Sequence, residues 1–191
     1  MVIQVARKAF KFYLRPSVDQ ECNLERIRAT CCELYNAALE EKKDAYRKRG
    51  MNLNCAAQQA ELTGVKRERP DVALIYSQVL QDTLKRLHRA FDAFFRRCKV
   101  GETPGYPRFR ASSRYDSFTF PQVGRDGALR AGGVDLIAGR LKVHGIPGTL
   151  KVKWHRSLEG RPKTATFKRE GSRWYVIFSC DEVPVEVLPS T

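Results

Sequence analysis

The residues of this sequence that could do chemistry are mainly cations that alternate with aromatic rings. Residues 105–110 read Gly-Tyr-Pro-Arg-Phe-Arg, and residues 115–121 read Tyr-Asp-Ser-Phe-Thr-Phe-Pro. Arginine side chains can neutralise phosphates, so Arg108 and Arg110 are candidate contacts to a nucleic acid. The flat rings of this region could stack on bases, although packing in a core is the more common role: Tyr106, Phe109 and Phe118.

The charge of the whole chain favours the same kind of partner. Its 191 residues include 35 Lys and Arg against 21 Asp and Glu, which gives a formal net charge of +14. The excess is spread along the chain, at +4 for residues 1–16, +4 for residues 17–100 and +6 for residues 101–191. A folded basic surface of this kind indicates a polyanion as partner rather than a small acidic metabolite.

Metal, cofactor and catalytic sites are not predicted. None of the six cysteines forms a C-x-x-C pair, and the three histidines lack the spacing of metal ligands. The sequence contains no phosphate-binding glycine loop and none of the common hydrolase or metalloprotease motifs. No apolar run is longer than the five residues of Val72–Tyr76, and the first ten residues do not resemble a signal peptide. We therefore expect a cytoplasmic protein with no membrane partner, no cofactor and no catalytic residue.

The elements that must position the candidate residues begin with a strand and a long helix. Residues 4–15 alternate between apolar and polar side chains, which predicts a strand that Pro16 ends. Ser17 and Gln20 have the spacing of a capping box at a helix start. An apolar stripe at three- and four-residue steps then predicts a helix over residues 18–48 at most.

Two further helices are predicted from composition and spacing. An Ala- and Gln-rich segment indicates a helix over residues 54–66, and Pro70 then interrupts the helical pattern. A second apolar stripe predicts a third helix over residues 74–98, with most of its cations off the apolar face. Each of these cations could be merely solvated, but the cluster favours phosphate contacts: Lys85, Arg86, Arg89, Arg96, Arg97 and Lys99.

Beyond residue 101 the pattern changes to short strands separated by glycines. A lone N-terminal strand is unstable, so it must pair with these later strands. The fold class is therefore predicted as α+β, a small β-barrel or strongly curved sheet interrupted by three helices. Five later strands are predicted, the last two joined by a tight turn at residues 170–172: 117–120, 140–143, 150–155, 164–169 and 173–180.

Four segments, in this order along the chain, carry a family resemblance: residues 8–16, the Tyr35-Asn36 pair, residues 84–96 and residues 105–110. Together they resemble the N-terminal half of the OrfB/TnpB family of transposon-encoded proteins, the ancestors of type V CRISPR nucleases. The resemblance covers nearly the whole chain. It implies a wedge-type β-barrel interrupted by a helical recognition lobe. Residues 1–16 would be the first barrel strand, residues 17–100 the lobe and residues 101–191 the rest of the barrel.

The resemblance also implies the partners and the residues that contact them. The partners would be a guide RNA from the transposon end and double-stranded DNA with a short flanking motif. Glutamine can read base edges, and three glutamines at matching positions would face the flanking DNA, although they could be only solvated: Gln78, Gln81 and Gln122. The basic candidates for nucleic-acid binding are Arg7, Lys8, Lys11, Lys85, Arg89, Arg108 and Arg110.

One departure from the family bears on function. Family members continue into a RuvC-like nuclease domain with three metal-binding carboxylates and a four-cysteine zinc module, and this sequence has no counterpart of either. It therefore predicts a nucleic-acid-binding portion that is not itself catalytic, with the oligomeric state left open. The alternatives are part of an active RNA-guided endonuclease or transposase completed by a missing or separate nuclease domain, a stand-alone helix-turn-helix-like DNA-binding protein, and a non-functional remnant.

Overall fold

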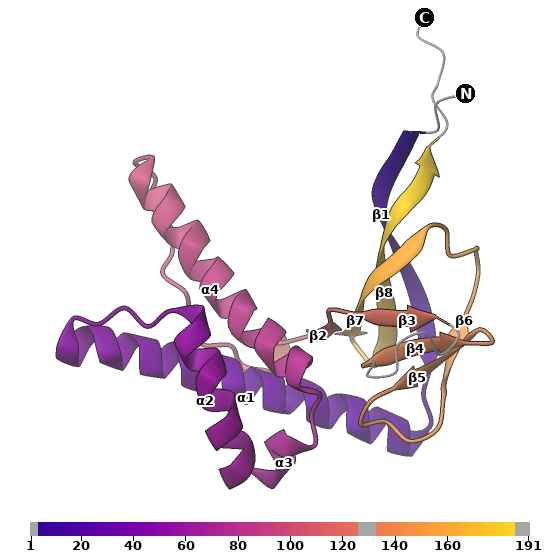
Figure 1. Cartoon of the computed structure of the whole chain (residues 1–191), viewed down its shortest axis with the longest axis horizontal. Helices are drawn as coiled ribbons and strands as arrows, with labels where there is room; N and C mark the ends of the chain where they lie inside the picture. The colour runs from indigo at the N-terminus through magenta and orange to yellow at the C-terminus, as the bar shows by residue number, and fades with distance from the viewer. Residues whose placement is uncertain (1–3, 126–132, 186–191) are drawn as a thin grey trace, which may run out of the picture. The chain divides into compact units, whose positions relative to one another are not determined.

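A computed structural model describes residues 4–125 and 133–185 of the chain (Figure 1). The chain divides into two compact units, a barrel unit of residues 1–24 and 117–191 and a helical unit of residues 25–116. The helical unit is therefore an insertion in the sequence of the barrel unit. The described residues mix α and β structure, with four α-helices and one eight-stranded sheet.

The sheet of the barrel unit is curled and nearly closed. All neighbouring strands are antiparallel except the parallel pair β3 and β4, and the edge strand β3 also lies against β7. The order across the sheet is β2 (Ser117–Phe120), β7 (Arg161–Glu170), β8 (Arg173–Val185), β1 (Gln4–Arg15), β6 (Leu150–Lys153), β5 (Arg140–Val143), β4 (Val134–Ile137) and β3 (Val123–Arg125).

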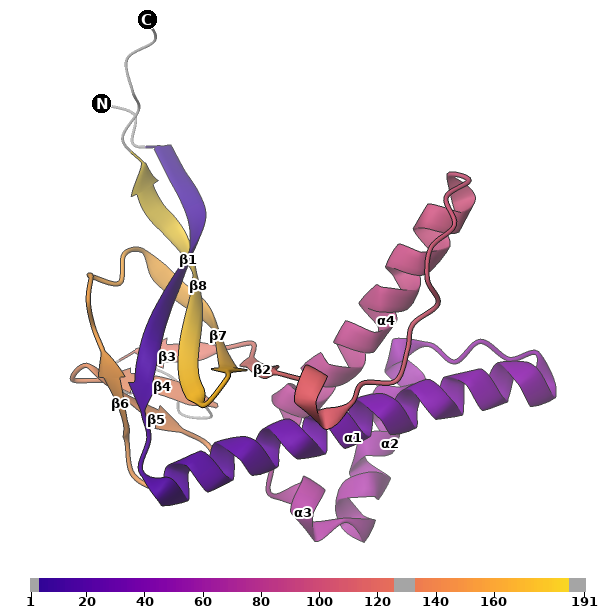
Figure 2. The same ribbon diagram turned by 180° about the vertical axis from the view of Figure 1, so that it is seen from behind.

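The pairing of the N-terminal strand with the later strands is confirmed. β1 pairs with β8 on one side and with β6 on the other. Figures 1 and 2 both show β1 and β8 side by side along their lengths. The alternation predicted for β1 is also confirmed, because Phe10, Phe12 and Leu14 are buried.

Aromatic rings from several strands fill the inside of the barrel. The Phe12 ring lies 4.5 Å from the ring of Trp154, between centroids, and 6.2 Å from that of Phe178. Phe118 of β2 stacks on Phe167 of β7 at 5.4 Å. Burial of such large apolar side chains is the main favourable term that holds the curled sheet together.

The predicted strands were incomplete in three places. The structure adds β3 and β4, begins β7 at Arg161 and ends β6 at Lys153 rather than at residue 155. β3 and β4 have three and four residues, and so short a run carries no clear alternation in the sequence. Their pairing partners in the sheet therefore decide that they are strands. The predicted tight turn is confirmed, since Glu170 pairs with Arg173 across it.

The prediction of three helices was wrong, because the described residues form four α-helices. They are α1 (Val18–Arg49), α2 (Cys55–Glu68), α3 (Pro70–Ala73) and α4 (Ser77–Lys99). Pro70 begins the short helix α3, at a first helical position where its fixed φ is favourable and its missing N–H costs nothing. The last helix begins at Ser77 rather than at residue 74, because Tyr76 has an extended ψ of 126°.

The capping box at the start of α1 is confirmed. The backbone N–H of Gln20 donates to Ser17 Oγ at 3.3 Å, and the backbone N–H of Ser17 donates to Gln20 Oε1 at 3.1 Å. The Gln20 amide also donates to the carbonyl of Pro147 at 2.9 Å, within the barrel unit. This end of α1 is therefore fixed to the loop that precedes β6.

The core of the helical unit is the apolar face of α4. Leu80, Leu84, Leu87 and Phe91 are buried as predicted, whereas Cys98 is exposed. α2 packs against both α3 and α4. Figure 2 shows the segment after α4 returning beside that helix towards the short 3-10 helix at Ser112–Arg114. The return brings the predicted basic and aromatic segment 105–110 back against the helices.

Candidate nucleic-acid interfaces

The first candidate interface is the side of the barrel sheet opposite its buried core. Alternation along β1 places Lys11, Tyr13 and Arg15 on this side, because Phe12 and Leu14 point inward. Strand register then adds residues from the neighbouring strands. We call the set the outer basic face, and it consists of Lys11, Tyr13, Arg15, Arg140, Lys151, Lys153, Lys168 and Tyr175.

Two rows of side chains cross the strands on the outer basic face. In the first, Arg15 is directly opposite Lys151, which is directly opposite Arg140. In the second, Tyr13 is opposite Lys153 on one side and opposite Tyr175 on the other. The first row therefore has three adjacent cations, with Ile137 opposite Arg140 at its end. The second row continues to Lys168 opposite Tyr175, so it combines two cations with two aromatic rings.

Two shallow hollows lie on this face and share Lys153. One, of about 410 Å³, is lined by Arg15, Arg140, Lys151, Lys153 and the Trp154 ring among others. The other, of about 520 Å³, is lined by Lys11, Tyr13, Lys153, His155, Arg156 and Tyr175. Both hollows are lined by cations and rings, with no carboxylate among the lining residues, so they suit a phosphate or a base.

A single carboxylate modulates the charge at one end of the outer basic face. Glu170 forms ion pairs with Lys11 at 2.5 Å and with Lys168 at 3.1 Å. Hydrogen bonds from Lys11 first and Lys168 second lower the pKa of Glu170, so it stays ionised at neutral pH. The Lys11 ammonium also lies 4.2 Å from the centroid of the Tyr175 ring, in a cation–π contact.

The other candidate residues of the barrel unit lie elsewhere. Arg7 forms an ion pair with Asp181 at 2.6 Å, and Lys163 pairs with the same carboxylate at 2.6 Å. Hydrogen bonds from these two cations lower the pKa of Asp181. Lys8 is exposed, and alternation places it on the opposite side of β1 from Lys11. Gln122 is exposed between β2 and β3.

The second candidate interface is a polar stripe along α4. Gln78, Gln81, Lys85 and Arg89 follow one another at steps of three, four and four residues, so the helix brings all four onto one side. Lys85 and Arg89 are exposed, and the two glutamines are half-buried. Asp82 lies on the same side and pairs with Arg89 at 3.1 Å. The structure thus groups these four candidates on one helix face.

The segment that carries Arg108 and Arg110 is held by side chains of α1. The Asn36 amide donates to the backbone carbonyl of Arg110 at 2.9 Å and accepts from its N–H at 2.8 Å. The buried guanidinium of Arg28 donates to the carbonyls of Tyr115, at 2.6 Å, and of Ser112.

The hydrogen bond that Arg28 donates to the Glu25 carboxylate raises the pKa of Arg28, which therefore stays charged. The side chains of Arg108 and Arg110 are exposed, and no described carboxylate forms an ion pair with either. The backbone of the segment is thus fixed, while its two arginines face solvent.

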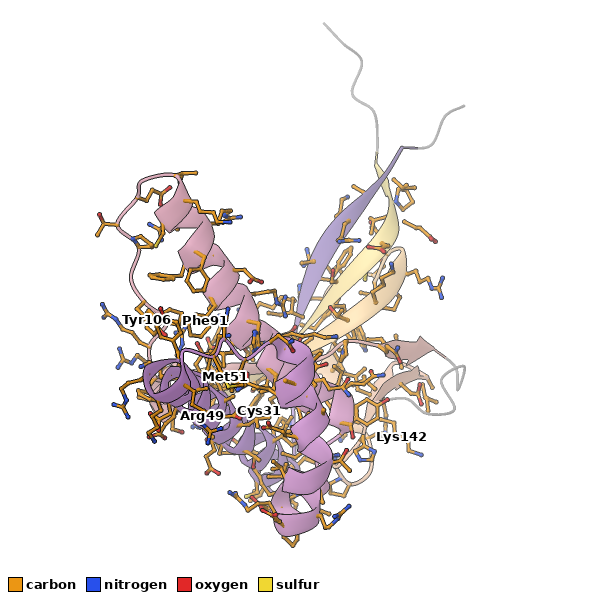
Figure 3. All side chains as sticks on the ribbon, turned by 60° about the vertical axis from the view of Figure 1, so that its left-hand side comes forward. Cys31, Arg49, Met51, Phe91, Tyr106 and Lys142 are labelled. Atoms are coloured by element: carbon orange, nitrogen blue, oxygen red, sulfur yellow. The ribbon has the colours of Figure 1, made fainter. Side chains whose placement is uncertain are left out.

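The rings of segment 105–120 divide between core and surface. Phe118 is buried, whereas Tyr106 and Phe109 are 44% and 49% exposed. Figure 3 shows Tyr106 beside Phe91 of α4, and their ring centroids are 5.4 Å apart. Tyr115 and Phe120 are buried as well, so the expectation that most such rings pack in a core is confirmed, with Tyr106 and Phe109 as the exposed exceptions.

Sequence reasoning missed most of the outer basic face. Tyr13 and Arg15 alternate with Phe12 and Leu14, so the strand pattern could have added them to Lys11. The cations of β5 and β6 also alternate with apolar residues, but nothing in the sequence shows that they share a face with β1. They join the face only because the sheet places β6 beside β1, about 140 residues away in sequence.

The described residues contain no group of three or more His, Cys, Asp or Glu side chains placed to hold a metal ion. Among the helices of the described ranges, none has the length and apolarity needed to span a membrane.

Comparisons with known proteins show what the chain is similar to. Residues 1–51 match the family model HTH_OrfB_IS605, described as a helix-turn-helix domain. In this chain the described part of that stretch, residues 4–51, forms the strand β1 and the single helix α1. The matched segment therefore does not by itself form two helices joined by a turn.

Two curated relatives align with nearly all of the chain. "Putative RNA-guided DNA endonuclease InsQ" of Escherichia coli strain K12 is 28% identical over 188 residues, which cover 96% of this chain and 43% of that protein. "Putative RNA-guided DNA endonuclease" of Streptomyces pristinaespiralis is 27% identical over 196 residues, which cover 100% of this chain and 45% of that protein. The chain spans less than half the length of these relatives.

Among solved structures, the cryo-EM structure of the Cas12f1–sgRNA–target DNA complex matches with a TM-score of 0.46 and 15% sequence identity, over 96% of this chain and 49% of that chain. The family match and the two curated relatives confirm the resemblance found in the sequence. The chain carries an OrfB domain at its N-terminus and is a distant relative of the TnpB class of RNA-guided endonucleases.

Proposed function

We propose that this chain is the nucleic-acid-binding portion of a TnpB-like protein and is not itself catalytic. The barrel unit is a wedge-type barrel whose outer basic face binds a guide RNA from the transposon end. The helical unit is a recognition lobe whose α4 stripe faces double-stranded DNA with a short flanking motif. The observation that carries the proposal is the row of Arg15, Lys151 and Arg140 across three neighbouring strands.

This row of cations lowers the stability of the barrel when no ligand is bound. Neighbouring strands are about 5 Å apart, and like charges directly opposite each other on a sheet repel. No described carboxylate forms an ion pair with any of the three cations. A bound phosphate backbone would remove the repulsion, and the rings of Tyr13 and Tyr175 beside the row suit unstacked bases. A folding role does not account for the row, whereas RNA binding does.

The polar stripe of α4 supports the DNA part of the proposal. Gln81 has an amide group of the kind that pairs with base edges, adenine in particular, and Lys85 and Arg89 can contact the adjoining phosphates. The Oε1 atom of Gln78 is buried, so Gln78 would contact a base edge through its NH₂ group. All four lie on one side of a straight helix, which is the kind of element that enters a major groove.

A second candidate function follows from the two curated relatives. Both are named as RNA-guided DNA endonucleases, and both are more than twice as long as the stretch that this chain matches. The chain would then bind RNA and DNA for a nuclease that lies on a further domain or a separate protein. RNA binding by the chain would be the same as in the first proposal, and DNA cleavage would require that nuclease.

The decisive experiment measures RNA affinity against salt concentration for the purified chain and two charge variants. Lys151→Gln removes the central cation of the row, and the control Arg67→Gln removes an exposed cation at the end of α2. We expect Lys151→Gln to weaken binding to a structured RNA and to reduce the slope of log K against log salt by about 0.7–0.9. Its free energy of unfolding should be unchanged or slightly raised, because repulsion is relieved.

The control variant should match the wild type in both affinity and slope. Equal effects of Lys151→Gln and Arg67→Gln would contradict the proposed RNA surface, since the location of the charge would then not matter. The same preparations incubated with magnesium and target DNA should show no cleavage. Cleavage by the chain alone would contradict the non-catalytic part of the proposal.

A further inference from the structure

The helical unit carries a cluster of aromatic rings that the proposed RNA and DNA contacts do not use, in which Phe95, Tyr106 and Phe109 are exposed, Phe94 is half-buried and Phe91 is the buried base. Three come from the C-terminal half of α4 and two from the segment after it. We call this group the aromatic platform, and it consists of Phe91, Phe94, Phe95, Tyr106 and Phe109. Tyr106 meets Phe91 and Phe94 edge-on, with centroids 5.4 and 5.3 Å apart. Phe95 packs on Phe94 at 5.2 Å and is 46% exposed.

A cation from α1 completes the platform. The Lys43 ammonium lies 4.3 Å from the centroid of Phe109 and 5.5 Å from that of Tyr106. A cation beside an aromatic ring attracts a phosphate to the same side of the site. Phe109 is therefore a half-exposed ring with a positive charge at close range.

The surroundings of the platform are strongly basic. Segments 43–49 and 96–110 together contain nine basic and two acidic residues. Both acids are already engaged, since Asp44 pairs with Arg47 and Lys48, and Glu102 pairs with Arg97. An apolar patch for a protein partner would need an acidic partner surface, whereas a nucleic-acid strand offers flat apolar bases together with phosphates.

The rings are also held in place before anything binds. Asn36 forms hydrogen bonds with the backbone N–H and C=O of Arg110, one residue after Phe109. The Tyr106 ring contacts the rings of Phe91 and Phe94 on α4. Because these rings are already ordered, stacking a ligand on them costs little conformational entropy of the protein.

From these observations we propose that the aromatic platform binds unpaired nucleobases of a single strand, with Phe109 and Tyr106 as the stacking rings. Lys43 and the exposed Arg108 contact the adjoining phosphates. Stacking on aromatic rings tolerates any base, so the platform selects single-stranded over paired nucleic acid rather than a particular sequence. The proposal rests on the proposed function, which it extends by a site for unpaired bases on the helical unit.

The test uses an unstructured RNA of about 12 nucleotides with a single 2-aminopurine, whose fluorescence falls when it stacks. Phe109→Leu keeps an apolar side chain but removes the flat ring, and Phe109→Tyr keeps the ring. We expect Phe109→Leu to weaken binding by about tenfold and to abolish the fluorescence change, with Phe109→Tyr close to the wild type. The salt slope should not change, because no charge is removed, and a fully paired duplex of the same length should bind both variants equally.

Other outcomes would overturn the proposal in distinguishable ways. Equal quenching in Phe109→Leu and the wild type would show that the bases stack elsewhere, while structured-RNA binding that still depends on Lys151 would leave the proposed function intact. A wild-type chain that binds neither the unstructured nor the structured RNA would contradict the proposed function itself. Self-association that Phe109→Leu abolishes, measured by sedimentation velocity, would show that a second copy covers the platform instead.

Discussion

At the scale of single residues, two glycines in the barrel unit have similar backbone conformations but differ in the space available for a side chain. Gly160, just before β7, has a φ of +70°, and a Cβ there would overlap the Asp181 carbonyl oxygen and lie 2.8 Å from Val183 Cγ2. Gly171, in the turn between β7 and β8, has a φ of +60°, but a Cβ would meet no atom within 4 Å. Both conformations are unfavourable for residues other than glycine, and only Gly160 is also crowded.

We therefore expect Gly160→Ala to lower the free energy of unfolding by about 2–4 kcal/mol, the sum of backbone strain and overlap. Gly171→Ala is the matched control and should cost about 1 kcal/mol, from strain alone. Urea denaturation followed by tryptophan fluorescence would measure both, because Trp174 is buried in the same sheet. Similar costs for the two variants would show that the contact with Asp181 relaxes freely.

At the scale of elements, the segment after α4 depends on α1 for its conformation. It has no regular structure from Val100 to Ala111, and its backbone is held by Asn36 and Arg28 through hydrogen bonds to Arg110, Ser112 and Tyr115. Irregular backbone next to a packed helix needs such partners, because its N–H and C=O groups lack a ladder or a helix. The exposed arginines and rings of this segment are thus positioned by α1.

For this reason Asn36→Ala should release the segment without unfolding the helices. The expected loss is about 1 kcal/mol, because water can replace the amide at this partly exposed position. Hydrogen exchange of the Arg110 amide should become faster, and RNA binding through Arg108 and Arg110 should weaken. Thr63→Ala, which shortens an exposed polar side chain of α2 outside the candidate sites, is the control. Unchanged exchange at Arg110 would show that Arg28 alone holds the segment.

At the scale of the whole molecule, the net charge of +14 is carried by surfaces of both units. The barrel unit has the outer basic face, and the helical unit has the α4 stripe and the aromatic platform. The acidic residues reduce this charge only locally, as Glu170 does for Lys11 and Lys168. Changing one carboxylate on the outer basic face should therefore change affinity for a polyanion.

We expect Glu170→Gln to raise the affinity for structured RNA about two- to fivefold at low salt, since it frees two ammonium groups for phosphates. The gain should shrink as salt is added, because exposed charges are screened. Asp71→Asn, which removes an exposed carboxylate paired with Arg69 in the helical unit, is the control. An unchanged or lower affinity for Glu170→Gln would show that RNA does not contact this end of the face.

The local elements of the fold could be predicted from the sequence. The bounds of β1, the capping box at Ser17 and the turn after Glu170 all follow from residues close together in the chain. Alternation, capping and turn formation are short-range effects, so the sequence contains their full signal. α3, β3 and β4 were missed because three or four residues carry too little of that signal.

The sequence by itself determined the basic character of the chain, the family resemblance and the candidate cations Lys11, Arg108 and Arg110. Only the tertiary structure decided which side chains share a surface. It placed Lys151 and Arg140 in line with Arg15, and Lys43 over Phe109, from segments far apart in the chain. The physical reason is that strand register and helix packing depend on burying the whole core at once, and no local pattern contains that information.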